Sequence, residues 1–382
     1  MSAETARARQ VFRIMGAIVS HGGMMRIVMH SRRRFLLTSA AAAALTVRSR
    51  AQDGGAQRLP LDRLQAWEAL GYGMFIHFGM STFDGQELSP GDKPSSFYNP
   101  TKLDVDQWIS VARDAGMKYA VLTTKHVAGH CLWPSKHTRY HVGTSGNQTD
   151  VVAAFVKACE RRGVMPGFYY CSWDNHNRFG SLTWSDTIAL RKSGQSKGAT
   201  VPEPYVSREY EEFQMAQLAE LLTGYGKIGE VWIDIPMMLT RDYRNRLYAQ
   251  IAQWQPDTVI MMNHGIGDGS QLDTSKAWPT DLMAIERFLP NSATGHVPWR
   301  TIENKRYYIP GEVCDPIAKE WFYVDNDPPR SDAELLGMYL VTRTRRSNLL
   351  LDVPPDRTGV IPPMHTAALM RLRKNIDRVG GV

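Results

Sequence analysis

Eight short apolar runs, mostly separated by segments with helical spacing, constrain the fold of this chain more than any other feature. We predict strands over these runs: 71–79, 119–126, 167–171, 230–235, 259–263, 280–286, 309–314 and 348–353. The segments with helical spacing are 104–115, 150–162, 207–225, 240–254, 331–345 and 364–379. Alternating strands and helices predict an α/β protein with a parallel sheet. Eight strands predict a (β/α)8 TIM-like barrel, formed by residues 52–382 as a single catalytic domain.

A doubly wound open sheet is the alternative for such an alternation. Sheets of that kind often bind nucleotides, and they then carry glycine-rich phosphate-binding motifs after a strand. No GxGxxG motif follows the first apolar run, and no GxxxxGK[ST] motif occurs in the chain. The barrel is therefore the favoured fold.

Residues 1–51 have the features of an export signal. The stretch 31–37 contains three consecutive arginines before Phe-Leu-Leu, which is typical of a twin-arginine signal peptide. The apolar run 35–47 is shorter than the ~20 residues that cross a bilayer. Small residues at 49 and 51 predict cleavage after Ala51. We expect a periplasmic or secreted protein that has no membrane attachment after cleavage.

The net charge of +7 is concentrated in the same segment. Residues 1–51 contain nine arginines and one acid, Glu4, so the remainder of the chain carries −1. The basic character therefore gives no support to nucleic acid as a partner. The four cysteines (131, 159, 171 and 314) are too sparse for a disulfide scaffold, and we expect them to be buried free thiols.

Polar or ionisable residues stand at or near the carboxyl ends of the predicted strands. They are His77, His126, Tyr169, Asp234, Asn263, His264, Glu286, Glu312 and Asp352. In a parallel barrel the carboxyl ends of all strands meet on the face where chemistry is done. Asp234 is the clearest case, because a carboxylate directly after a buried strand is costly unless it is paired or used.

Two chemistries fit these residues. In glycoside hydrolysis one carboxylate attacks the sugar or activates water, and a second protonates the leaving oxygen. Asp234 and Glu286 are the candidates, with Glu312 in reserve, and His77 and His126 would donate hydrogen bonds to sugar hydroxyls. Ten tryptophans in the mature chain favour this chemistry, since aromatic faces stack on sugars.

The other chemistry is that of a metal-dependent hydrolase. His77, His126, Asp234 and His264 could together hold Zn²⁺ or a pair of metals. The histidines are scattered singly, however, and form no HxH or HExxH pair.

The chain resembles the alpha-L-fucosidases of glycoside hydrolase family 29. The matching segments, which run from about residue 65 to the C-terminus, are GMFIHFG (73–79), GMKYAVLTTKH (116–126), CLWPS (131–135), DVV (150–152), GFYY (167–170), VWID (231–234) and NLLLDVPP (348–355). The resemblance implies a barrel, a retaining exo-glycosidase and a fucosylated glycan as substrate, with no metal or other cofactor.

The resemblance also implies a role for each matching residue. Asp234 matches the nucleophile, and Glu286 matches one form of the general acid/base. His77, His126, Tyr169 and Trp232 match residues of the sugar pocket. Glu312 is the competing choice for the acid/base and is otherwise a substrate-binding residue.

Three departures from the family pattern are visible. The family usually has a second His and then an Asp where this chain has Val127 and Ala128, and we expect His130 to replace the lost contact. Asp352 stands where Asn is usual. Many members carry a C-terminal β-sandwich, and we expect none in a chain that ends at Val382. A non-catalytic sugar-binding barrel is therefore kept as a further alternative, and a modified fucose or a related sugar remains open as substrate.

Overall fold

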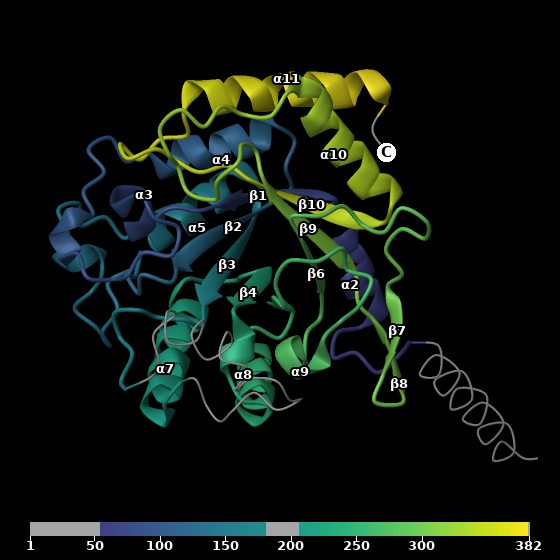
Figure 1. Cartoon of the computed structure of the whole chain (residues 1–382), viewed down its shortest axis with the longest axis horizontal. Coiled ribbons are helices and arrows are strands. Elements are labelled where there is room, and N and C mark those ends of the chain that lie inside the picture. The colour runs from purple at the N-terminus through teal and green to yellow at the C-terminus, as the bar shows by residue number, and fades with distance from the viewer. Residues whose placement is uncertain (1–53, 181–205, 381–382) are drawn as a thin grey trace, which may run out of the picture. The chain divides into compact units, whose positions relative to one another are not determined.

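Eight parallel strands form a single curved sheet in the computed structural model, which describes residues 54–180 and 206–380 (Figure 1). The strands are β1 (Tyr72–Ile76), β2 (Tyr119–Lys125), β3 (Met165–Cys171), β4 (Glu230–Asp234), β5 (Val259–Met262), β6 (Met283–Glu286), β9 (Gly311–Pro316) and β10 (Ser347–Asp352). Their spatial order is β5-β4-β3-β2-β1-β10-β9-β6. Because β10 pairs with β1, the sheet curls round into a nearly closed barrel. The predicted (β/α)8 fold is confirmed.

The seam of the barrel lies between β5 and β6, and side chains bridge it. The backbone N–H groups of Ile260 and Met262 donate to Asp281 Oδ2 (2.9 Å) and Thr280 Oγ1 (3.1 Å). Asp281 N donates in turn to Ile260 O (2.8 Å). We predicted a strand from residue 280, but regular pairing with β9 begins only at Met283. The first residues of the predicted strand close the seam with side chains instead.

All the predicted helices are present. The described residues also form one helix before β1 and two short helices. The helices are α2 (Leu61–Glu68), α3 (Met80–Asp84), α4 (Val105–Asp114), α5 (Val151–Arg162), α7 (Arg208–Gly224), α8 (Arg241–Trp254), α9 (Thr274–Ala277), α10 (Asp332–Thr344) and α11 (Pro363–Val379). The cap of α10 is a capping box of Ser331 and Glu334, as its sequence indicates. In Figure 1, α10 and α11 cover one side of the barrel, and α7 and α8 lie on the opposite side.

Burial explains why most strands consist of continuous apolar runs. Every residue of β1, β2, β5 and β10 is buried, because the barrel interior covers one face of a strand and the helices cover the other. The four cysteines are buried free thiols, as predicted.

A short antiparallel hairpin replaces a helix between β6 and β9. Its strands are β7 (Trp299–Ile302) and β8 (Lys305–Tyr308), joined by Glu303 and Asn304, which both have positive φ. The sequence analysis did not predict this hairpin.

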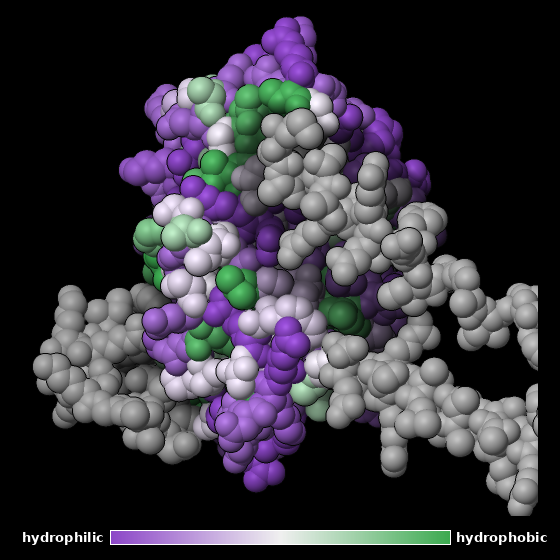
Figure 2. All heavy atoms as spheres, turned by 90° about the vertical axis from the view of Figure 1, so that its right-hand side faces the viewer, coloured by the Kyte–Doolittle hydropathy of each residue, from purple (hydrophilic) through white to green (hydrophobic). Residues whose placement is uncertain are grey.

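One prediction, the export signal in residues 1–51, lies outside the described residues. Within the described ranges, no helix is long and apolar enough to cross a membrane. Where grey atoms do not cover it, the face shown in Figure 2 is hydrophilic with small hydrophobic patches.

Candidate active site

The barrel brings the predicted strand-end residues together at its carboxyl end. Cys171 of β3 pairs with Asp234 of β4, Glu286 of β6 pairs with Cys314 of β9, and Asp352 of β10 pairs with Phe75 of β1. All six residues lie at or near the carboxyl ends of their strands. Their side chains therefore converge in a layer just above the packed interior.

Asp234 is held by one hydrogen bond on each carboxyl oxygen. The hydroxyl of Tyr169 donates to Oδ2 over 2.6 Å, and the amide of Asn263 donates to Oδ1 over 2.8 Å. Tyr169 is buried two residues before the end of β3, and Asn263 is buried directly after β5. Donors from both neighbouring strands thus fix the orientation of this carboxylate.

The same amide nitrogen connects Asp234 with Glu286. Asn263 Nδ2 also donates to Glu286 Oε2, over 2.9 Å. Together the two bonds limit the separation of the bonded oxygens to about 5.7 Å. Inverting glycosidases hold their carboxyl groups ~6.5–9.5 Å apart and retaining ones ~5–5.5 Å apart. The bridge through Asn263 fits the second arrangement.

Glu286 is poised to hold a proton near neutral pH. Burial raises the pKa of its carboxyl group to about 7, and the neighbouring charge of Asp234 adds to the effect, while the bond from Asn263 opposes it. A carboxyl group with this pKa can give a proton to a leaving oxygen and later take one from water.

His77 is fixed by Asp352 at the opposite side of the site. Asp352 Oδ1 lies 2.8 Å from His77 Nδ1 and also accepts the backbone N–H of His77 over 3.2 Å. We assign the ring proton to Nδ1, because Oδ1 then accepts both donors. Burial lowers the pKa of His77 to about 3, so the ring is neutral. Its Nε2 is therefore an acceptor, whereas the sequence analysis expected a donor.

Aromatic rings surround the two histidines. His126 stacks on Tyr169 with ring centroids 5.5 Å apart, and its centroid lies 5.7 Å from that of His77. Two residues of the loop after β9 complete the wall, since Trp321 and Phe322 lie 5.1 Å and 5.2 Å from the His77 ring. The site thus combines acceptors and donors with apolar faces, as sugar-binding pockets do.

Trp232 lies one layer below Asp234 on the same face of β4. Its indole stacks on Tyr169 at 6.2 Å and packs against Phe75 at 5.1 Å. Only 1% of it is exposed, so it forms the base of the site rather than its wall.

Two charged residues of this site were not predicted from the sequence. Glu87 lies in the loop after β1 and is exposed at the mouth of the site. The pKa of its carboxyl group is nevertheless raised. Partial burial is the main cause, and the negative charges of Glu320, Asp234 and Asp352 add to it. The positive charge of Arg287 opposes this shift, and its guanidinium lies 4.5 Å from the Trp321 ring centroid. The adjacency of Arg287 to Glu286 is a signal that the sequence contains. Nothing local distinguishes Glu87 from other loop acids.

Two predicted residues are not brought into the site. Glu312 is completely buried inside the barrel, where it accepts the indole N–H of Trp232 (3.0 Å) and the hydroxyl of Tyr119 (2.9 Å). His130 lies 2.8 Å from Ser145 Oγ and stacks on Tyr98. Glu312 therefore packs below the layer of Asp234, and His130 packs within the loop after β2.

The departure from the family pattern at 127 and 128 falls in a buried turn. Val127 and Ala128 are 0% and 2% exposed, and the N–H of Gly129 closes the turn on His126 O over 2.9 Å. Val127 O accepts the N–H of Asn175 over 2.8 Å, which ties the turn to the loop after β3. Since His130 packs elsewhere, it does not replace the missing pocket contact.

The metal alternative gains no support from the arrangement. Across residues 54–180 and 206–380, no three His, Cys, Asp or Glu side chains are grouped so that they could hold a metal ion. His77, His126, Asp234 and His264 are thus not gathered as a ligand set.

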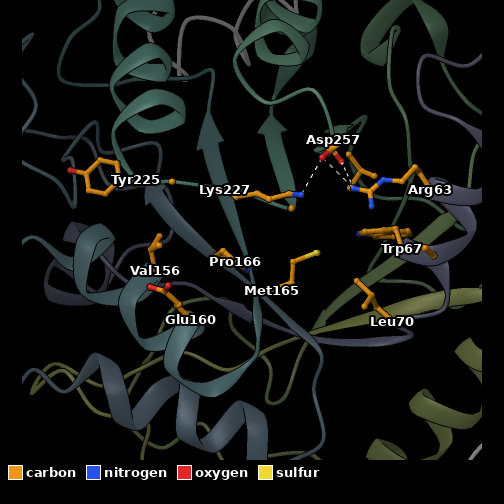
Figure 3. Close-up of a pocket in the computed structure, with 14 residues that line it drawn as sticks. Arg63, Trp67, Leu70, Val156, Glu160, Met165, Pro166, Tyr225, Lys227 and Asp257 are labelled. Carbon is orange, nitrogen blue, oxygen red and sulfur yellow. Dashed lines mark hydrogen bonds and ion pairs between the residues drawn. The ribbon is translucent and has the colours of Figure 1, made fainter.

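A second concavity lies at the opposite end of the barrel. This cavity, of about 620 Å³, is lined by Met165 and Pro166 at the start of β3, by Val259 at the start of β5 and by Trp67 of α2 (Figure 3). Its charged rim is internally neutralised, as Arg63 and Lys227 both approach Asp257. The strand-end carboxyl groups do not line it, so it is not the active site.

A barrel that holds two carboxyl groups this close at its carboxyl end, beside aromatic and imidazole side chains, has the architecture of a glycoside hydrolase. A family model described as alpha-L-fucosidase matches residues 92–380, and the chain belongs to this family. The resemblance seen in the sequence is thereby confirmed.

Individual relatives agree with the family. Alpha-L-fucosidase 1 of Arabidopsis thaliana is 32% identical over 79% of this chain and 57% of its own length. Human tissue alpha-L-fucosidase is 24% identical over 73% of this chain and 53% of its own length. The chain therefore spans little more than half the length of these two relatives.

Solved structures share the fold. Alpha-L-fucosidase isoenzyme 1 from Paenibacillus thiaminolyticus superposes with a TM-score of 0.67, at 25% identity, over 82% of this chain and 75% of its own. An alpha-L-fucosidase from Lactobacillus casei, solved with its alpha-L-fucose product, gives a TM-score of 0.62 at 20% identity, over 83% of this chain and 99% of its own. At that identity the second likeness concerns the fold alone.

Proposed function

We propose that this chain is a retaining exo-acting alpha-L-fucosidase that cleaves a terminal fucose from a fucosylated glycan. The observation that carries the proposal is the bridge from Asn263 to Asp234 and Glu286, over 2.8 Å and 2.9 Å. The bridge supports a double displacement, because it keeps the bonded oxygens of the two carboxyl groups within about 5.7 Å of each other. It links Asp234, which accepts two hydrogen bonds, to Glu286, whose pKa is raised to about 7. Membership of the alpha-L-fucosidase family supplies the sugar.

The first step forms a covalent ester. A carboxylate oxygen of Asp234 attacks the anomeric carbon, and the bond from that carbon to the glycosidic oxygen breaks. Glu286 gives its proton to that oxygen, and the aglycone leaves as an alcohol. Glu286, now ionised, takes a proton from water as the water attacks the same carbon, which releases fucose and restores both carboxyl groups.

Recognition of the sugar would fall to the remaining residues of the layer. His77 Nε2 can accept a hydroxyl proton, and Glu87 can accept another at the mouth of the site. Trp321 and Phe322 offer apolar faces to the ring and to the methyl group that distinguishes a 6-deoxy sugar.

Export through the twin-arginine route belongs to the same proposal and rests on residues 31–51. We expect the secreted protein to begin near Gln52. N-terminal sequencing of material from the periplasm or medium tests this, and a chain that begins at Met1 in the cytoplasm would contradict it.

Three variants test the catalytic assignment on an aryl alpha-L-fucoside. Asp234→Ala should lower turnover ~10³-fold or more, since the covalent route is lost. Glu286→Ala should regain activity with azide and yield a fucosyl azide, whereas Glu312→Ala should not respond to azide. Binding of fucose without turnover by the wild type would instead establish a non-catalytic sugar-binding barrel, and loss of activity in EDTA would indicate a metal-dependent hydrolase.

A further inference from the structure

Two glutamates lie near each other in the packed interior of the barrel, beneath the proposed active site. Glu230 is the first residue of β4, and Glu312 is the second residue of β9. Both are 0% exposed. An ionised carboxylate in such a place is costly unless donors or a cation compensate it.

The donors to the two carboxyl groups can be counted. Glu312 accepts the hydroxyl of Tyr119 at Oε1 and the indole N–H of Trp232 at Oε2. Glu230 accepts one donor, the indole N–H of Trp67, at Oε2 over 3.1 Å. Its other oxygen, Oε1, is buried and receives no donor, and the carboxyl group of Glu230 interacts with that of Glu312. Two carboxyl groups can share a hydrogen bond only when one of them carries a proton.

The unequal donor count decides which group carries that proton. Glu312 already has a donor on each oxygen, so it behaves as the anion, and Glu230 behaves as the neutral acid. Burial and the neighbouring Glu312 accordingly raise the pKa of Glu230 well above its ordinary value. The bonds from Glu230, Trp232 and Tyr119 oppose the effect of burial on the pKa of Glu312.

The other groups around the pair do not supply a charge. Tyr119 of β2 and Cys314 of β9 are the titratable neighbours, and burial raises the pKa of each, so both are neutral. Asn348 of β10 lies beside Tyr119, and Arg343 of α10 donates to Asn348 over 3.0 Å rather than to a carboxyl group. Trp67 closes the pair from below, where it also lines the cavity of Figure 3.

The pair is connected to the active site by direct contacts. The indole N–H of Trp232 donates to Glu312 Oε2 over 3.0 Å, and Trp232 also interacts with Glu230. That indole stacks on Tyr169, and Tyr169 donates to Asp234. A shift of the Trp232 ring would therefore reach the nucleophile through a single intervening side chain.

We propose that Glu230 and Glu312 share one proton and act together as the positioning device for Trp232, and through Trp232 and Tyr169 for Asp234. The positioning role rests on the proposed function, whereas the shared proton does not.

Replacing Glu230 by Gln and Glu312 by Gln distinguishes this arrangement from simple packing. In E230Q the amide N–H takes the place of the acid O–H, so every bond of the pair survives. We expect its kcat/KM on an aryl alpha-L-fucoside to stay within about threefold of wild type. In E312Q a single oxygen must serve Tyr119 and Trp232, and we expect kcat/KM to fall ~10–100-fold, chiefly in kcat, because a misplaced reacting group is costly. Equal losses in the two variants would overturn the positioning role.

A further comparison avoids E312Q, should that variant not fold. E230A removes the donor to Glu312, so we expect its kcat/KM to be lower than that of wild type. E230Q keeps a donor at this position, so we expect its kcat/KM to remain close to that of wild type. An E230A protein as active as E230Q would show that Glu312 needs no such donor and would overturn the positioning role.

The shared proton is tested by urea unfolding of wild type and E230Q from pH 5 to pH 8. Folded wild type keeps a proton that the unfolded chain releases above a pKa of about 4.5. Its stability therefore falls relative to E230Q as pH rises, and the ratio of the two unfolding constants should change about tenfold per pH unit. Parallel pH dependences would overturn the shared proton. A wild type without fucosidase activity would overturn the proposed function but leave this comparison intact.

Discussion

Tyr169 donates its hydroxyl proton to Asp234 Oδ2 over 2.6 Å, between adjacent parallel strands. A bond to an ionised group is among the stronger hydrogen bonds in proteins, and this one also fixes the direction of the carboxylate. The next residue, Tyr170, points to the other side of β3 and donates to Gln217 over 2.8 Å. One strand thus offers a tyrosine of the candidate active site and a matched control.

We expect Tyr169→Phe to lower kcat ~10–100-fold on an aryl alpha-L-fucoside, because a hydrogen bond to a charged group worth ~1.5–3 kcal/mol is lost. Tyr170→Phe also loses a buried hydrogen bond but should leave kcat unchanged. Steady-state kinetics on both variants checks this. Similar kcat values for the two would show that the bond to Asp234 does not matter.

The pKa of Glu286 predicts the alkaline limb of the pH profile. Because the raised pKa is about 7, the carboxyl group is protonated below that pH and competent as the acid. As pH rises through 7 the acid form is lost, and kcat/KM should fall about tenfold per unit thereafter. Glu286→Gln should lack this limb. A wild-type profile flat to pH 9 would contradict the assignment.

Asn263 lowers the pKa of Glu286 through its hydrogen bond. Asn263→Ala should therefore move the alkaline limb to higher pH, even though kcat falls because Asp234 loses a donor. A shift of the alkaline limb distinguishes this effect from a general disruption of the site. Such a disruption would lower kcat without changing the pH at which the rate begins to fall. A limb that stays in place would argue against the bridge.

Asp352 holds His77 through Oδ1, and the amide oxygen of Asn could accept the same two N–H groups. We expect Asp352→Asn to keep kcat/KM within about threefold of wild type, because both bonds survive. Asp352→Ala leaves a buried ring N–H without its acceptor, which costs ~1–3 kcal/mol, and should raise KM by about tenfold or more. Measurement of KM for both variants checks the prediction, and equal losses would refute it.

Lys125 and Asp174 form a completely buried ion pair of 2.7 Å next to His126. Lys125→Met would leave Asp174 charged and unpaired, and we expect a loss of ~3–5 kcal/mol in unfolding free energy. Arg208→Ala, which breaks an ion pair whose side chains are 86% and 70% exposed, serves as the control and should change stability little. Urea unfolding measures both.

Much of the fold was readable from local pattern. The eight strands, the helices between them and the capping box at Ser331 depend on residues that are neighbours in the chain, so the sequence predicts them. The strand ends that carry Asp234, Glu286 and His77 were predictable for the same reason. The hairpin at 299–308 was missed because its edges lack the alternation of a half-buried strand, and only Ile302 and Tyr308 are buried.

The depth of a residue in the barrel was not readable. Glu286 ends one predicted strand and Glu312 lies within another, and the sequence left both as candidates for the acid. Pairing places Glu286 level with Cys314, so Glu312 lies two residues deeper, where it meets Glu230. Register is a property of two strands that are distant in sequence, and no spacing within either strand encodes it.

The sequence alone determined the barrel and its family and singled out Asp234 as the proposed nucleophile, because periodicity and motifs are written in consecutive residues. Tertiary structure alone decided that Asn263 joins the two carboxyl groups, that Asp352 holds the ring of His77 and that Glu312 belongs to the interior. These facts depend on which side chains meet across the barrel. Such meetings are set by strand register and by the burial that raises or lowers each pKa, and both arise only when the chain has closed on itself.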